Sequence, residues 1–406
     1  MTRRRDLPPP VAERPRDSAG AVLRAILDHG PVARSSVARA TRLSAASVSG
    51  LVSALVRDGL VREVPEAAGP PGTGRPHVPV DIEPDDAGVI GAHIAVPRIT
   101  VARLDLRGRV IEQRQEPHGR RDPASVLAAL RRSILEQAKG RRILGLGVAT
   151  GGWVDAANGT LVEHHLLGWH KVPLAAVLAD ATGLPVSVDS NSRALLKAEQ
   201  LFGDAAPRAR RSAVHLFVGN VVDVAFSANG VVHQGPRSAA GAVAHLAIEG
   251  CDALCACGRT GCLQAAVSDQ TLVRRALDAA TIDRPDIHAL LDAATKGHPG
   301  AVALFVERAR LVGRAAGLLL DLFDPEVLVV VEAGANRMPH CLATLRAEAA
   351  ARSSAWSSAR AGTEPGAEVL RRTSFPDHVL AVAGGAVALD RIYAEPLAPV
   401  EHLRAG

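Results

Sequence analysis

A chain of 406 residues, of which 47% are apolar, is long enough for two or three domains with sizeable cores. It has no run of 18 apolar residues, which argues against a membrane span, and its basic start lacks the apolar stretch of a secretory signal. Residues 1–80 hold 12 arginines and seven acidic residues, so the whole net charge of +5 lies there. This asymmetry favours a nucleic-acid-binding head on a neutral body, with a solvated basic tail as the alternative.

The first part of the head is predicted to be a tail followed by two short helices. Residues 1–17 are rich in Pro and Arg, and we expect them to form a disordered basic tail. Ser18 is expected to cap a first helix over 19–29, which ends at a glycine. A second short helix is expected over 34–41.

A third helix and a hairpin complete the predicted head. Ser44 is expected to cap this helix, whose apolar residues share one face: Val48, Leu51, Val52, Leu55 and Val56. Residues 60–80 have the pattern of two strand ends around a wing rich in Gly and Pro. The order predicts a winged helix-turn-helix domain over 18–82, with the third helix as the recognition helix. A small helical dimerisation domain is the alternative.

Several residues of the head are candidates for DNA contacts. Small residues that could approach base edges or phosphates open the third helix: Ser44, Ala45, Ala46, Ser47 and Ser49. Three arginines are candidate phosphate contacts, which supply affinity but little sequence information: Arg34, Arg42 and Arg57. Arg75, at the tip of the wing, could reach into a minor groove.

After Pro84 the apolar pattern has a period of two, which indicates strands. Three strands, a helix, a strand and a helix are expected in that order, and the order then repeats. The first set comprises strands over 88–96, 99–106, 110–116 and 143–150, a helix over 123–138, and a strand, a turn and a helix over 184–203. The repeat predicts an α/β body of two lobes.

The second set starts at a strand over 213–219 and a hairpin over 222–235 that turns at Asn229-Gly230. Helices are expected over 268–322, then a buried strand, and finally a glycine turn and a helix near the end of the chain. We place the first lobe at 86–200, completed by 379–395, and the second at 201–378.

Four of the five cysteines lie close together in the second lobe. Cys255, Cys257 and Cys262 form the pattern C-x-C-G-x-x-G-C, and His245 stands ten residues upstream. Three thiolates and one imidazole are the ligands of a closed, structural zinc site, so we predict bound Zn²⁺. Buried free thiols or a disulfide are the alternatives, and Cys251 could replace one ligand. Such a site without a secretory signal fits a reducing cytoplasm.

The pattern H-x9-C-x-C-G-x-x-G-C-L resembles the signature of the ROK family of repressors, open reading frames and sugar kinases. The resemblance covers most of the chain, and the head looks like the winged domain of ROK repressors. It implies an actin-like, ribonuclease-H-type fold for the body. It also implies that the zinc shapes a loop beside a sugar cleft.

The resemblance also implies that kinase activity is lost, because three nucleotide turns depart from the family pattern. Family kinases carry D-x-G-G-T after the first strand, where this chain has the segment from Ala92 to Pro97 without an acid for magnesium. The family's G-T-G-x-G-x-G corresponds to the segment from Gly219 to Ala225, whose side chains would obstruct a phosphate. A third glycine run is eroded from Glu332 to Ala335.

The sugar side of the family cleft is half kept. Asp189 aligns with the general base, but Val188 and Ala242 stand where the family has polar sugar contacts. The retained candidates for binding an effector are His165, Asp189, Asn191, His245 and Gln264. From position alone, Asp189 could instead cap the following helix and His165 could be a surface histidine.

The sequence therefore predicts a DNA-binding transcriptional regulator, expected to be a repressor, and not an enzyme. Its expected partners are a double-stranded DNA operator, a sugar or sugar-derived effector, and further copies of itself in a homodimer or a dimer of dimers. We expect no membrane association and a cytoplasmic location. The alternatives are a sugar kinase fused to a DNA-binding head, and a dimeric DNA-binding protein that senses no effector.

Overall fold

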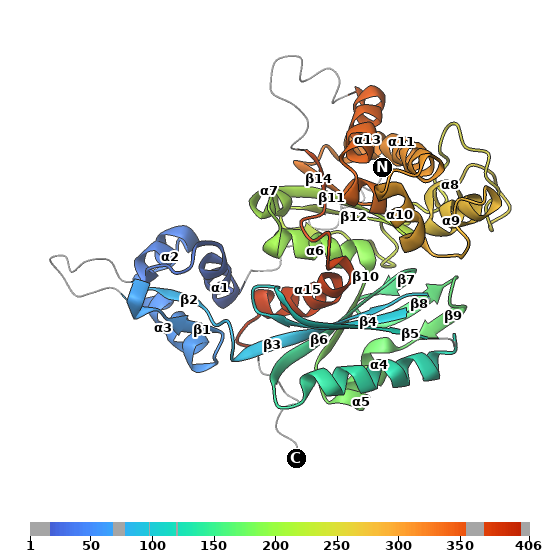
Figure 1. Cartoon of the computed structure of the whole chain (residues 1–406). Helices are drawn as coiled ribbons and strands as arrows, with labels where there is room; N and C mark the ends of the chain where they lie inside the picture. Colours follow the sequence, from blue (N-terminus) through green and yellow to red (C-terminus); the bar gives the residue numbers. More distant parts are fainter. Residues whose placement is uncertain (1–16, 68–77, 97, 119–120, 355–368, 399–406) are drawn as a thin grey trace, which may run out of the picture. The chain divides into compact units, whose positions relative to one another are not determined.

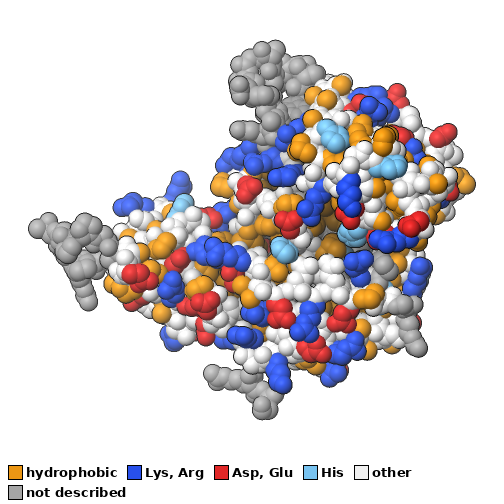
Figure 2. Space-filling view, in the orientation of Figure 1, with side chains coloured by type: hydrophobic (Ala, Val, Ile, Leu, Met, Phe, Trp, Pro, Cys, Tyr) orange, Lys and Arg blue, Asp and Glu red, His pale blue; other side chains and the backbone are white. Residues whose placement is uncertain are grey.

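The chain forms two compact units in the computed structural model, which describes residues 17–67, 78–96, 98–118, 121–354 and 369–398 (Figure 1). One unit, the head, holds the described residues up to Asp86 and those from Arg391 onward. The other, the body, runs from Ala87 to Asp390. Acidic and basic side chains are interspersed over the visible face of the body (Figure 2), in keeping with its balanced charge. No helix of the described residues is long and apolar enough to cross a membrane.

The head consists of three helices and a two-stranded antiparallel sheet, as predicted. The helices are α1 (Ser18–His29), α2 (Arg34–Thr41) and α3 (Ala45–Arg57), and the strands are β1 (Val61–Glu63) and β2 (Val80–Ile82), with the short 3-10 helix η1 (Pro65–Ala67) after β1. The apolar face of α3 supplies buried residues to the core: Val48, Val52 and Leu55. Residues 1–16 of the predicted tail and most of the wing lie outside the described residues, while Asp17, which was predicted to belong to the tail, is ordered as the cap of α1.

One predicted cap in the head is wrong and another is confirmed. Asp17, not Ser18, caps α1, and its carboxylate accepts a hydrogen bond from the N–H of Ala19 at 3.3 Å. The helix therefore begins one residue earlier than expected, because the carboxylate of Asp17 can cap it in place of the hydroxyl of Ser18. Ser44 caps α3 as predicted, with its hydroxyl accepting from the N–H of Ser47 at 3.1 Å.

Lobe 1 of the body is built on a five-stranded sheet in the order β10-β6-β3-β4-β5. Its strands are β3 (Ala87–Ile94), β4 (Arg98–Asp105), β5 (Val110–Pro117), β6 (Arg142–Thr150) and β10 (Val186–Ser190). Strand β3 pairs parallel with β6 and antiparallel with β4. Two helices and a small sheet complete the lobe: α4 (Pro123–Ala138), α5 (Leu174–Thr182), β7 (Trp153–Asp155), β8 (Thr160–His164) and β9 (Trp169–Val172).

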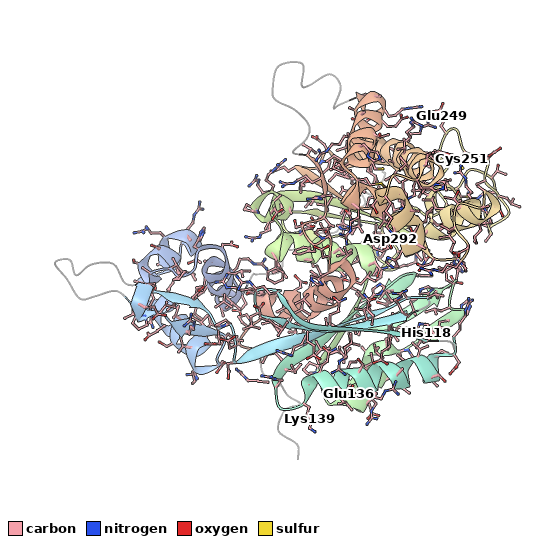
Figure 3. All side chains as sticks on the ribbon, viewed as in Figure 1. His118, Glu136, Lys139, Glu249, Cys251 and Asp292 are labelled. Carbon is pink, nitrogen blue, oxygen red and sulfur yellow. The ribbon has the colours of Figure 1, made fainter. Side chains whose placement is uncertain are left out.

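Helix α4 lies along the lobe 1 sheet, and side chains near its end are visible in Figure 3. Glu136 on α4 pairs with Arg114 on β5 at 2.7 Å. The apolar face of α4 is buried through Val126, Leu130 and Ile134, as the helical period of the sequence predicts.

Lobe 2 repeats the strand pairing of lobe 1, so the predicted duplication is confirmed. Its sheet has the order β13-β12-β11-β14-β15, with antiparallel pairs before β11 and parallel pairs after it. The strands are β11 (Ser212–Val218), β12 (Val222–Ala228), β13 (Val231–Val232), β14 (Val327–Val331) and β15 (Leu370–Arg372). The helices are α7 (Ala206–Arg211), α8 (Leu263–Val267), α9 (Asp269–Asp278), α10 (Ile287–Thr295), α11 (Pro299–Phe323), α12 (Ala333–Arg337) and α13 (Pro339–Arg352).

Helix α6 (Asn191–Phe202) joins the lobes, because it packs on β10 of lobe 1 and on β11 and β12 of lobe 2. It follows β10 directly, without the turn that the sequence suggested. Ala194 and Leu195 of α6 share a buried apolar cluster with residues from both sheets, including Ala149 and Phe217.

The predicted glycine turn near the end of the chain is wrong, because Gly384 and Gly385 lie inside the continuous helix α15 (Val379–Ala394). A Cβ atom on Gly384 would lie 2.5 Å from the backbone N of Ala92 on β3. Gly91 faces Gly385 so closely that a Cβ on it would also collide. The glycines therefore serve close packing of a helix on a sheet rather than a turn.

Candidate functional sites

The start of α3 is exposed, as a recognition helix requires. Its five small candidates, Ser44, Ala45, Ala46, Ser47 and Ser49, are all solvent-exposed. The opposite face is fixed in the core, so this side is presented in one orientation. Ser44 and Ser47 also share a hydrogen bond between their hydroxyls at 2.8 Å, which leaves only part of their bonding capacity for a partner.

The four candidate arginines of the head are placed differently. Arg34 forms an ion pair with Glu63 of β1 at 2.7 Å, so its charge is already partly neutralised. Arg42, in the left-handed region at φ 58°, ends α2 and is exposed. Arg57 is exposed at the end of α3. Arg75 lies outside the described residues.

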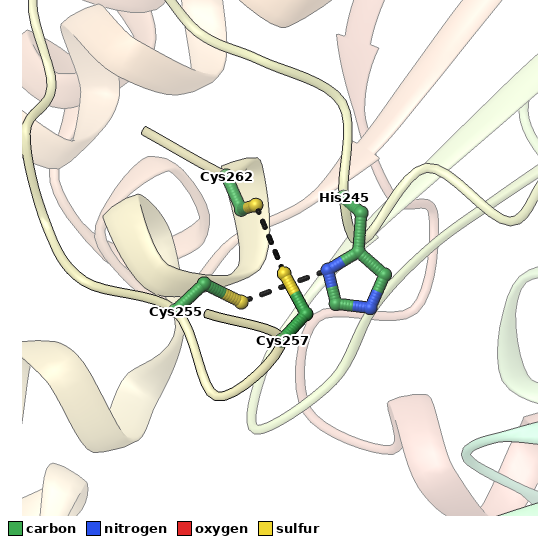
Figure 4. Close-up of side chains that lie close together, drawn as sticks. All are labelled: His245, Cys255, Cys257 and Cys262. Carbon is green, nitrogen blue, oxygen red and sulfur yellow. Dashed lines mark hydrogen bonds between the residues drawn. The ribbon is translucent and has the colours of Figure 1, made fainter. Parts of the chain in front are cut away.

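The three predicted cysteines and His245 meet at one point in lobe 2 (Figure 4). Their four ligand atoms all lie within 4.8 Å of one another. The Sγ of Cys255 is 3.6 Å from the Nδ1 of His245, and the Sγ atoms of Cys257 and Cys262 are 3.7 Å apart. Atoms at tetrahedral positions around one zinc ion, about 2.0–2.3 Å from it, would have separations of this size.

Two glycines shape the loop that carries these ligands. Gly258 and Gly261 have φ values of 83° and 73°, where other residues are strained. A Cβ on Gly261 would also lie 2.7 Å from the carbonyl oxygen of Cys251. Cys251 itself, labelled in Figure 3, is not in the group of four, which answers the ambiguity that the sequence left open.

Arg259 is a residue of this loop that the sequence analysis did not single out. Its hydrogen bonds to Cys257 are the largest cause that lowers the pKa of that thiol, to about 6. The lowered pKa favours the thiolate form of Cys257, the form that binds metals, whereas burial raises the pKa of its neighbour Cys262 to about 11. The sequence signal that could have indicated Arg259 is a basic residue two positions after a candidate ligand cysteine.

Asp189, which the sequence analysis aligned with the family's general base, is fully buried and paired with two cations. Its carboxylate lies 2.5 Å from Nε of Arg193 and 3.1 Å from Nζ of Lys197. Burial raises the pKa of Asp189, but Lys197 and Arg193 outweigh burial and hold the pKa below its ordinary value. A carboxylate neutralised in this way is a poor proton acceptor. It does accept the N–H of Ser190, but it does not cap α6.

Two buried histidines that the sequence analysis did not single out, His93 and His164, interact electrostatically with each other. The Nε2 of His93 shares a hydrogen bond with the side-chain oxygen of Asn191 at 3.0 Å. Burial lowers the pKa of His93 and of His164 to about 4, so both rings are neutral. His165, the predicted candidate, is exposed beside Glu163 instead. His164 is the last residue of β8 (Thr160–His164) and is buried, whereas His165 lies in the turn that follows and is exposed.

The side chain of Gln264 holds the segment from Gly219 to Ala225, the second of the three that depart from the family's nucleotide turns. We call this segment the Asn220 turn. The side-chain oxygen of Gln264 accepts from the N–H of Val222 at 2.7 Å, and its amide donates to the carbonyl of Asn220 at 2.6 Å. The side chain of Asn220 also donates to the carbonyl of Val96 at 3.3 Å. Val96 lies in the first of the three segments that depart from the family's nucleotide turns. His118 donates to the carbonyl of Ala95 in that same segment at 2.6 Å (Figure 3).

The third segment that departs from a family nucleotide turn, from Glu332 to Ala335, carries a buried ion pair. Glu332 caps α12, where its carboxylate accepts from the N–H groups of Gly334 and Ala335 at 2.9 and 2.6 Å. Arg308 of α11 is fully buried and pairs with both Glu332 and Asp269. A carboxylate of the chain therefore occupies this helix start, where a bound anion would meet the same charge.

The sequence profile of the ROK family matches residues 89–359 of this chain. The chain is also 33% identical over 405 residues to the transcriptional regulator Rv0485 of Mycobacterium tuberculosis, which covers 96% of this chain and 89% of that protein. It is 26% identical over 268 residues to the DNA-binding transcriptional repressor Mlc of Escherichia coli, covering 64% of each.

Solved structures show the same fold. The structure of a ROK family transcriptional regulator, a homologue of E. coli Mlc, superposes with a TM-score of 0.75 at 23% identity, over 93% of this chain and 96% of that one. The ROK hexokinase of Thermus thermophilus superposes with a TM-score of 0.58 at 25% identity, over 75% of this chain and 99% of that one. The regulator structure therefore matches a larger share of this chain than the hexokinase does, 93% against 75%.

Proposed function

The chain belongs to the ROK family, and from this premise we propose that it is a DNA-binding transcriptional regulator, expected to act as a repressor, whose body is not a kinase. The observation that carries the proposal is the extent of the 33% identity, which spans the head as well as the body of a protein named a transcriptional regulator. A regulator that binds DNA would work in the cytoplasm.

In this proposal the head is a winged helix-turn-helix. Helices α2 and α3 form the helix-turn-helix pair, and the exposed start of α3 enters the major groove. Arg42 and Arg57 are the better candidates for phosphate contacts, because both are exposed and the ion pair of Arg57 with Asp58, at 3.7 Å, is longer than the 2.7 Å pair of Arg34 with Glu63. Strands β1 and β2 would carry the wing, with Arg75 near its tip.

The His–Cys group is proposed to bind a structural zinc ion. The donor set fits, since three sulfurs and one imidazole nitrogen lie close enough to share one ion and Cys257 is poised as a thiolate. Four protein ligands leave no open position for a reactive water, so the ion would fix the loop between Leu246 and Gln264 and take no part in a reaction.

Loss of kinase activity is supported by what replaces the nucleotide contacts. Phosphoryl transfer depends on positioning phosphates and metal and on a base near the hydroxyl. Asp189 is buried between Arg193 and Lys197, and Glu332 places a carboxylate where the third turn begins. A coupled ATPase assay with a panel of sugars should give no turnover above background, and sugar-dependent turnover would overturn this part.

The body is proposed to form the dimer contacts and to take a sugar-derived effector between its lobes. The retained candidates are Asn191, His245 and the fully buried Asp189. His165 is exposed and Gln264 is committed to its turn, so we give these two less weight. A homodimer or a dimer of dimers would bring two heads to two half-sites.

The test is selection of DNA by the purified full chain from a random library, followed by titration of the enriched sequence. We expect two half-sites whose centres are about one helical turn, roughly 10 base pairs, or a multiple apart. Affinity should fall steeply as salt rises. Arg42→Ala should weaken binding more than Arg34→Ala, which serves as the matched control. Failure to enrich any sequence would overturn the proposal.

A further inference from the structure

One buried arginine touches both lobes of the body. Arg193 lies in the first turn of α6, and its side chain is only 3% exposed. Each nitrogen of its guanidinium donates to a different segment: Nε to Asp189 at 2.5 Å, Nη2 to the carbonyl of Val154 at 2.8 Å, and Nη1 to the carbonyl of Ser238 at 3.0 Å. The first two acceptors belong to lobe 1 and the third to lobe 2.

A second contact reinforces the same joint. The indole N–H of Trp153, on β7, donates to the carbonyl of Arg237 at 2.8 Å. Arg237 and Ser238 are neighbours, so lobe 1 holds the lobe 2 segment 233–241 through two consecutive carbonyls. Ser238 has a φ of 53°, an uncommon value for serine, which indicates that this segment is set by its surroundings.

The position of Arg193 is chemically specific. The carboxylate of Asp189 accepts the Nε–H of Arg193 and also pairs with Lys197 at 3.1 Å. The two other nitrogens of the planar guanidinium reach carbonyls on either side of the joint, a spread that the single nitrogen of an ammonium does not offer.

We propose that Arg193 is a clamp that holds the two lobes of the body in one arrangement, with Asp189 fixing its guanidinium so that it reaches Val154 in lobe 1 and Ser238 in lobe 2. A change in the relative position of the lobes must first break these hydrogen bonds, and in doing so releases the segment 233–241 from lobe 1. The proposal concerns the body alone and does not depend on DNA binding by the head.

The inference is tested by hydrogen exchange on the full chain, with Arg193→Met compared with Arg308→Met. Both variants remove a buried, ion-paired arginine, but Arg308 pairs only within lobe 2, with Asp269 and Glu332. Arg193→Met should accelerate amide exchange in 233–241 and in β7 by about tenfold or more, because local opening sets these rates. Arg308→Met should accelerate exchange around α9 and α12 and leave 233–241 near the wild-type rate.

Two further variants keep the test decisive if Arg193→Met fails to fold. Arg193→Lys keeps a cation beside Asp189 but cannot span all three acceptors, so 233–241 should still exchange faster. Trp153→Phe removes only the neighbouring hydrogen bond and should raise exchange there by a smaller factor. Wild-type exchange in 233–241 for Arg193→Lys, or equal acceleration by Arg308→Met, would overturn the proposal.

Discussion

The cysteine loop and the Asn220 turn, both in lobe 2, differ in what fixes their backbone. Between Ala244 and Cys262 the structure has two isolated bridges, and four ligand atoms converge on one point. The Asn220 turn is instead held by the side chain of Gln264, which bonds to both of its sides. The first region groups four potential metal ligands, and the second is held by hydrogen bonds from a side chain of the same lobe. The two regions therefore differ in whether a bound ion could add to the contacts that fix the backbone.

Removing a ligand from the cysteine loop is the strongest test of this contrast. Cys257→Ser should abolish zinc binding and lower the midpoint of thermal unfolding by roughly 10 °C, because metal binding contributes directly to folding free energy. Elemental analysis and calorimetry measure the two effects. Cys251→Ser, which lies outside the group of four, should retain one zinc per chain. One zinc per chain in Cys257→Ser would refute the assignment.

Buried histidines outside the cysteine loop make the stability of the body depend on pH. Burial lowers the pKa of His215 from its ordinary value of 6.5 to about 3, so the folded state binds fewer protons than the unfolded state between these values. Stability present above pH 6.5 is therefore lost as the pH falls toward 3. His93 and His164 add to the same loss.

The variant His215→Leu measures this loss at one site. Its ring nitrogens have no hydrogen-bond partners, so leucine removes the proton-binding group without breaking a contact. Between about pH 7.5 and 4.5 the unfolding free energy of the wild type should fall by roughly 2–3 kcal/mol more than that of the variant, since one pKa unit is worth 1.36 kcal/mol. Urea titrations at both pH values check this, and equal losses would contradict it.

The Asn220 turn can be loosened in two steps. Gln264→Ala leaves the N–H of Val222 and the carbonyl of Asn220 without their partner, which should cost about 2 kcal/mol. Asn220→Ala removes one longer hydrogen bond, to Val96, and should cost roughly 0.5–1 kcal/mol. Chemical denaturation of both variants measures the difference. A larger loss in Asn220→Ala would show that the bridge between turns, not Gln264, holds this region.

The smallest effect on stability is expected from a substitution in the predicted wing of the head. Arg75→Ala should leave the unfolding midpoint unchanged and reduce the slope of log affinity against log salt by about 1, the loss of one phosphate contact. Anisotropy titrations with the selected DNA over a range of salt give the slope. An unchanged slope would remove the wing from the interface.

The order of elements could be predicted from the sequence because each element carries its own pattern. The face of α3 with Val48, Val52 and Leu55 follows the helical period, and the strands after Pro84 follow the period of two. The His245–Cys262 group could also be found, because its members are near one another along the chain and their residue types are rare elsewhere. Local spacing was enough for both.

Partners far apart in the chain could not be predicted. The signal for Gly384 and Gly385 was read as a turn, since only the fold shows that β3 approaches them. Asp189 and Arg193 are only four residues apart in the sequence. The contact of Arg193 with Ser238 in the other lobe, however, is formed only by the fold. Likewise, nothing local distinguishes His164 from His165.

The family, the repeated order of strands and helices, and the candidate metal ligands of the cysteine loop could all be inferred from the sequence alone. Each of these rests on residue types and spacings that stay close along the chain. The tertiary structure decided which polar groups are buried and what they bind: Arg193 at Asp189, Gln264 at its turn, and Glu332 with Arg308. Burial and pairing depend on segments brought together only by folding, and desolvation makes each such pairing obligatory.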